Sequence, residues 1–111
     1  MDVANMDLKE QILLNIKKGN QGIIPVKGIS MEPTLREGNV LVVYAQKDYS
    51  VGDIVVYSYR EEGYLVHRII EINKGAVMCK GDNSKRIEVI MKRQIIGKVV
   101  RYISGGKINE T

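Results

Sequence analysis

One serine of this chain stands in a turn whose residue types suit nucleophilic catalysis. The run VKGISMEPTL at residues 26–35 places Ser30 between two apolar segments. Gly28 lets the backbone approach a substrate closely, and Pro33 restricts the turn by fixing its own φ. A serine hydroxyl becomes a useful nucleophile when a neighbouring base takes its proton. The segment therefore suggests a reactive serine, although the same residue types are common in ordinary turns.

The single histidine of the chain is the candidate for that base, because a general base needs a pKa near the working pH. His67 lies in the middle of an alternating run at residues 64–72, which predicts a strand. A lone histidine among apolar neighbours is more often structural than catalytic. Asp82 follows in the loop KGDNS at residues 80–84. Its carboxylate could orient an imidazole, or it could only shape an Asx turn.

Composition limits the kinds of chemistry that are available. The 111 residues suffice for one domain with a single core. The net charge is +4 and the 17 basic residues are scattered, so we expect no nucleic-acid partner. One histidine and one cysteine fall short of a metal-ligand set, and we expect no metal and no cofactor. The cysteine, Cys79, has no turn motif of its own and is a remote alternative nucleophile.

The sequence shows neither the pattern of a transmembrane segment nor that of a signal peptide. The longest strongly apolar run, at residues 40–45, is far shorter than the ~20 residues that cross a bilayer. Asp2 and Asp7 stand where a signal peptide would carry positive charge. We therefore expect a soluble, cytoplasmic chain without a transmembrane segment, which reaches a membrane only through a partner. The sequence leaves the oligomeric state open.

The elements that must position these residues are one helix and many short strands. Asp7 and Glu10 resemble a capping box, and apolar residues at helical spacing predict an amphipathic helix over residues 8–18 that packs on its own domain. Strands are expected at residues 22–26, 40–44, 54–59, 64–72, 76–80, 87–90 and 95–103. This pattern predicts a mainly β fold, a curled and partly closed antiparallel structure.

Five blocks of the sequence also match a known peptidase family in their order. They are GISMEPT at 28–34, GDIVV at 52–56, VHRII at 66–70, KGDN at 80–83 and IGKVV at 96–100. Over about residues 22–103 the chain resembles the type I signal peptidases and their relatives, the LexA-like self-cleaving repressors. The resemblance implies their fold, with a helix segment at 1–21 and a catalytic domain at 22–103. We expect the Gly-rich, polar residues 104–111 to form a flexible tail.

The resemblance also implies a division of roles. With histidine at position 67, the chain resembles the endoplasmic-reticulum and archaeal types of signal peptidase. This resemblance implies that Ser30 is the nucleophile and His67 the general base. The third, acidic member is either Asp82, whose motif is intact and which we favour, or Glu88, six positions further on. Histidine-type relatives often carry a serine where this chain has Gly28. Backbone N–H groups at Gly28 and Ser30, with that of Ser30 the leading candidate, would then meet the oxyanion.

A serine endopeptidase that cleaves a peptide or protein precursor after small residues is the function that this resemblance implies. The substrate would lie extended beside the strand that leads to Gly28, with four residues lining shallow pockets: Val26, Met31, Leu35 and Val66. Core packing is the simpler explanation for each of these four taken alone. A LexA-like regulatory domain and a catalytically silent domain that binds peptides by strand addition are the alternatives. Only a short helix precedes the serine block, where signal peptidases normally have a membrane anchor.

Overall fold

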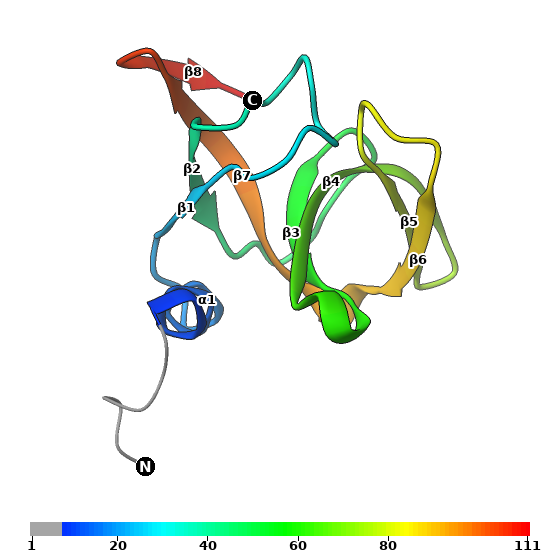
Figure 1. The fold of residues 1–111 in the computed structure, drawn as a ribbon. Helices are drawn as coiled ribbons and strands as arrows, with labels where there is room; N and C mark the ends of the chain where they lie inside the picture. Colours follow the sequence, from blue (N-terminus) through cyan, green and yellow to red (C-terminus); the bar gives the residue numbers. More distant parts are fainter. Residues whose placement is uncertain (1–7) are drawn as a thin grey trace.

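A computed structural model gives the structure of residues 8–111, which form one helix and eight strands (Figure 1). Asp7, the predicted capping residue, lies outside the described residues. The helix is α1 (Leu8–Lys17), and the strands are β1 (Gly22–Pro25), β2 (Val40–Tyr44), β3 (Ile54–Ser58), β4 (Tyr64–Asn73), β5 (Ala76–Lys80), β6 (Ile87–Met91), β7 (Ile95–Ser104) and β8 (Lys107–Glu110). Two 3-10 turns, η2 (Arg60–Glu62) and η3 (Lys92–Gln94), join β3 to β4 and β6 to β7.

All eight strands belong to one antiparallel sheet in the order β1-β2-β7-β3-β4-β5-β6, with β8 added to β7. Strand β7 is central, because it pairs with β3 near its start and with β2 and β8 near its end. Strands β3 to β6 curl toward a barrel (Figure 1). Register shifts at Val56/Tyr57 and Ile69/Glu71 accompany this curvature, since bulges bend and twist strands. The prediction of a mainly β, curled antiparallel fold is confirmed.

Strand β3 separates two hydrophobic cores. Its residues alternate, so that Val56 packs into the first core while Val55 and Tyr57 pack into the second. The first core lies beside the serine turn; its buried members are Ile16, Ile24, Met31, Leu35, Leu41, Val43, Ile54, Val56, Ile96 and Val99. The second lies within the curled strands and comprises Val55, Tyr57, Ile69, Val77, Cys79 and Ile90.

Helix α1 packs on β1 and β7, as the amphipathic pattern predicts. Its Ile16 is fully buried in the first core. Gly97 on β7 makes room for this contact, because a Cβ there would lie 2.8 Å from Val43 Cγ1 and 3.0 Å from Ile16 Cγ2. Within residues 8–111 there is no helix with the length and apolarity that a membrane crossing requires.

The prediction of a flexible tail at residues 104–111 is wrong, because Lys107–Glu110 form β8 against β7. A two-glycine loop at residues 105–106 has φ values of +56° and +79°, the positive values that a tight hairpin loop requires. Beyond the loop, Ile103 pairs with Ile108. The Gly-Gly pair followed by an apolar residue was the sequence signal for this hairpin.

Candidate active site

Ser30 lies on the irregular segment that follows β1. Gly28 has a φ of +79°, a region that favours glycine, and the Glu32–Pro33 peptide bond is cis. The amide of Leu35 donates to the carbonyl of Met31 at 2.9 Å, and both side chains are buried in the first core. The turn is therefore anchored by its apolar residues, while Ser30 itself stays half-buried.

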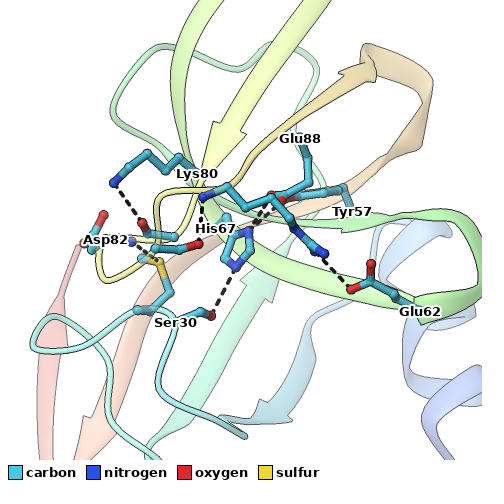
Figure 2. A network of polar contacts seen from close by, with 11 residues as sticks. Ser30, Tyr57, Glu62, His67, Lys80, Asp82 and Glu88 are labelled. Atoms are coloured by element: carbon cyan, nitrogen blue, oxygen red, sulfur yellow. Dashed lines mark hydrogen bonds and ion pairs between the residues drawn. The ribbon is translucent and has the colours of Figure 1, made fainter.

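The structure brings Ser30, His67 and Glu88 together (Figure 2). His67 Nε2 lies 3.1 Å from Ser30 Oγ, and His67 Nδ1 lies 2.7 Å from Glu88 Oε1. His67 comes from the middle of β4 and is 5% exposed, whereas Glu88 comes from β6 and is 0% exposed. A chain of hydrogen-bonding contacts thus runs from a half-buried hydroxyl, through an imidazole, to a buried carboxylate, which is the geometry of a serine–histidine–acid triad.

Glu88 is kept ionised by three donors. Burial acts to raise the pKa of Glu88, but hydrogen bonds from Tyr57, Arg86 and His67 outweigh it and hold the pKa below its ordinary value. Tyr57 Oη donates to Glu88 Oε1 at 2.6 Å, and Arg86 Nε donates to Oε2 at 2.6 Å. An ionised carboxylate only accepts hydrogen bonds, so the neutral imidazole must carry its proton on Nδ1. Its Nε2 is then free to accept the proton of Ser30.

Asp82 does not contact His67, and our preference for Asp82 as the acidic partner of the imidazole is wrong. Its carboxylate accepts hydrogen bonds from Arg68 Nε at 2.9 Å, Arg68 Nη2 at 2.8 Å and Thr34 Oγ1 at 2.6 Å. The Arg68 hydrogen bonds, with help from Thr34, lower the pKa of Asp82. Neighbouring residues of a strand point to opposite faces, so Arg68 and its partner Asp82 lie on the far side of β4 from the His67 ring. Glu88 points into the curled half of the sheet, as His67 does.

The loop between β5 and β6 holds the serine turn against His67. Asn83 donates from its backbone N to the Ser30 carbonyl at 2.8 Å and from Nδ2 to the Ile29 carbonyl at 3.1 Å. Gly81 allows this approach, because a Cβ there would meet the Ser30 carbonyl oxygen and lie 3.1 Å from His67 Nε2. The loop therefore holds the Ser30 hydroxyl close to the His67 imidazole.

A cavity of about 230 Å³ opens beside Ser30 and His67. Its lining includes all four residues that the sequence analysis expected, Val26, Met31, Leu35 and Val66, together with Pro25, Lys27, Gly28, Leu41, Tyr64 and Leu65. Two of the four, Met31 and Leu35, are at the same time buried members of the first core. Core packing and pocket lining are thus compatible here, because the floor of the cavity is the surface of the core.

The two expected oxyanion donors differ in their surroundings. The Gly28 N–H donates to Glu37 Oε1 at 3.1 Å on the exposed surface. Within residues 8–111, the Ser30 N–H donates to no protein acceptor. The Ser30 amide could therefore bind an acceptor without the loss of a hydrogen bond within residues 8–111.

Three groups of the site were missed from the sequence: Tyr57, Arg86 and Thr34. The alternation of β3 places Tyr57 on the His67 side of the sheet and could have flagged it, whereas nothing in the local sequence indicates Arg86 or Thr34. Burial raises the pKa of Cys79 to about 12, so its thiol is protonated at neutral pH and is a poor nucleophile. Among the residues that the structure describes, no cluster of three or more His, Cys, Asp or Glu could hold a metal ion.

Sequence comparison supplies a family for this fold and site. Residues 3–100 match the profile of the family described as Peptidase S24-like. The chain is 28% identical over 114 residues to the signal peptidase complex catalytic subunit SEC11 of Ogataea parapolymorpha. That alignment covers 79% of this chain and 65% of the SEC11 protein, so the chain spans less than two thirds of its relative. No solved structure matches the chain.

Proposed function

This chain belongs to the Peptidase S24-like family, and we propose that it is a serine endopeptidase that cleaves a precursor or leader peptide after a small residue. The observation that carries the proposal is the chain of contacts from Ser30 through His67 to Glu88, beside a cavity with a largely apolar lining. Residues 22–103 would form the catalytic unit, since they contain all three groups and the loop that aligns them.

The reaction follows from which atoms can carry protons. Ser30 Oγ attacks the scissile carbonyl carbon while its proton passes to His67 Nε2. The imidazolium that forms is stabilised by the Glu88 carboxylate at Nδ1. His67 then gives the proton to the leaving amine nitrogen as the C–N bond breaks. Water, deprotonated by the same imidazole, hydrolyses the acyl-enzyme and regenerates Ser30.

The negative charge of the tetrahedral intermediate would fall beside the Ser30 N–H. Removing one donor of an oxyanion hole typically raises a barrier by about 2.7–4 kcal/mol, so this single amide matters. Gly28 would contribute as well if Glu37, whose exposed carboxylate now holds the Gly28 N–H, moved aside for substrate. Asp82 takes no part in proton transfer in this scheme and acts by fastening the turn.

The shape of the cavity supports the choice of substrate. The cavity of about 230 Å³ is lined largely by apolar side chains, with Lys27 and Tyr64 among them, and this lining favours an apolar residue next to the cleaved bond. The SEC11 relative is named as the catalytic subunit of a signal peptidase complex, which favours a precursor peptide as substrate. A partner that brings this chain to a membrane is part of the same proposal.

The test is to incubate the chain with a library of extended peptides and to read the products by mass spectrometry. Wild type should cleave after small residues, and Ser30→Ala should not cleave. Ser50→Ala, which alters an exposed serine in another loop, serves as the matched control and should behave as wild type. A fluorophosphonate probe should label wild type and Ser50→Ala but not Ser30→Ala. Peptide binding without cleavage or labelling would refute the enzyme and favour a silent peptide-binding domain.

A further inference from the structure

A buried tyrosine lies behind the proposed triad and has no part in the reaction scheme above. Tyr57 is 0% exposed, and its Oη lies 2.6 Å from Glu88 Oε1 and 3.0 Å from His67 Nδ1. Burial, followed by the hydrogen bond to Glu88, raises the pKa of Tyr57 far above its ordinary value. The phenol is therefore a permanent donor at the back of the site.

The same oxygen of Glu88 serves two donors. Oε1 accepts from Tyr57 Oη and contacts His67 Nδ1, while Oε2 is held by Arg86 Nε. A carboxylate oxygen that already accepts one hydrogen bond is a weaker partner for a second donor. The phenol therefore competes with the imidazole for Glu88 and limits how strongly Glu88 favours the protonated ring.

The other charged groups around the pair are accounted for. Arg86 also donates from Nη2 to Glu62 Oε2 on η2 at 3.1 Å, so part of its charge is neutralised. Cys79 on β5 is an uncharged thiol at neutral pH. On the other face of β4, the charges of Arg68 and Asp82 pair with each other. Lys80 on β5, next to Asp82, donates from Nζ to the Gly81 carbonyl at 3.1 Å. Tyr57 is thus the neutral group in direct contact with both Glu88 and the imidazole.

We propose that Tyr57 is a positioning residue: its hydroxyl shares Glu88 Oε1 with His67 Nδ1 and thereby limits how strongly the carboxylate holds the imidazole. Its catalytic consequence rests on the proposed function. Its effect on the titration of His67, however, is a property of the folded chain and can be measured without any substrate.

His67 is the only histidine of the chain, so its ring resonances can be followed by NMR across a pH series without assignment ambiguity. Tyr57→Phe keeps the ring and removes the hydroxyl. The midpoint of the ring titration should move upward by about 0.5–1 pH unit, a fraction of the effect of one hydrogen bond to a charged group, because the lost bond acts on the imidazole through Glu88. Tyr44→Phe, which removes a hydroxyl that donates to Gln21 Oε1 at 2.7 Å elsewhere, should leave the midpoint unchanged.

A double-mutant cycle shows whether the effect passes through Glu88. In a Glu88→Gln background, Tyr57→Phe should no longer move the midpoint. If Tyr57→Phe does not fold, 3,5-difluorotyrosine at position 57 keeps the ring and hydroxyl but donates more strongly, and the midpoint should then move downward. An unmoved midpoint in these variants, or the same upward shift without Glu88, would overturn the inference.

Activity separates this inference from the proposed function. With cleavable peptide, the acid limb of kcat/KM should move upward with the NMR midpoint in Tyr57→Phe, whereas a loss of stability alone would not move that limb. An NMR shift in a chain that cleaves nothing would support the role of Tyr57 and refute the peptidase. Cleavage that depends on Ser30, together with an unmoved midpoint in Tyr57→Phe, would support the peptidase and refute the role of Tyr57.

Discussion

Replacing Gly81 with alanine tests whether the serine turn must lie as close to the β5–β6 loop as the structure places it. The φ of Gly81 is not in the positive region, so alanine can adopt its backbone and the effect of the new Cβ is steric. That Cβ would meet the Ser30 carbonyl oxygen and would lie 3.1 Å from both Cδ2 and Nε2 of His67. One methyl group therefore pushes on the turn that carries the nucleophile and on the ring that acts as its base.

The size of the effect follows from these contacts. The Ser30 carbonyl also accepts from the Asn83 amide at 2.8 Å, so the turn cannot retreat without stretching that bond. A displacement of about 1 Å in a catalytic constellation lowers the rate about 100-fold. We expect Gly81→Ala to lower kcat/KM by about that factor. We also expect it to lower the free energy of unfolding by about 1–3 kcal/mol, as overpacking does.

The assay compares kcat/KM on the best peptide of the library with urea unfolding of the same proteins. Gly75→Ala is the control, because Gly75 has a φ of +86° and no atom lies within 4 Å of its added Cβ. Gly75→Ala should lower the free energy of unfolding, because alanine disfavours this positive φ, and should leave kcat/KM near the wild-type value. A folded Gly81→Ala protein with wild-type kcat/KM would refute the reasoning, since the turn would then tolerate displacement.

Four further predictions concern the two carboxylates and the cavity. Glu88→Gln should lower kcat by about 10³–10⁴-fold with little change in KM, because the amide NH2 can donate to Nδ1 and so place the imidazole proton on Nε2. Steady-state kinetics tests this, and an effect on KM alone would contradict it. Asp82→Asn should lower the free energy of unfolding by about 1–3 kcal/mol through its weakened bonds to Arg68 and Thr34, while the acid limb of residual activity stays in place. The pKa of Glu88 is lower in the folded protein than in the unfolded chain, so the ionised carboxylate stabilises the fold above the ordinary carboxyl pKa, and this stabilisation is lost as the pH falls through the folded pKa. The free energy of unfolding, measured from pH 7 to 3, should therefore fall less steeply in Glu88→Gln than in wild type. Val66→Phe should fill the cavity and narrow cleavage toward glycine and alanine before the scissile bond, which the peptide library would show.

Most of the strands could be predicted because their alternation and their turns are local. The run at residues 64–72 and the glycine-bearing turns beside it predict β4 and its neighbours to within a residue or two. The hairpin to β8 was missed because its polar residues outweighed the Gly-Gly signal. Local composition cannot show that Ile108 has a partner across that turn in Ile103.

The acidic partner of His67 could not be chosen from the sequence, for a reason of register. The run IEVIM at residues 87–91 has apolar residues on both faces of the predicted strand. The sequence therefore does not reveal whether Glu88 lies on the same face of the sheet as His67. That face is set by the pairing of Cys79 with Glu88 across β5 and β6. The intact KGDN block favoured Asp82 by motif alone, yet its role in the structure is to bind Arg68 and Thr34.

The polar network within the second core is itself an argument for function. Burying an ionised carboxylate is costly, and a buried ion pair often contributes no more stability than apolar side chains of similar size. Here the cost of Glu88 is offset by donors on both of its oxygens, and within residues 8–111 no buried side-chain nitrogen or oxygen lacks a hydrogen-bond partner. The buried residues around this network are otherwise apolar: Val55, Ile69, Val77, Cys79 and Ile90. Stability alone is therefore a weak reason for placing His67 and Glu88 in this core, whereas the proposed activation of Ser30 requires both.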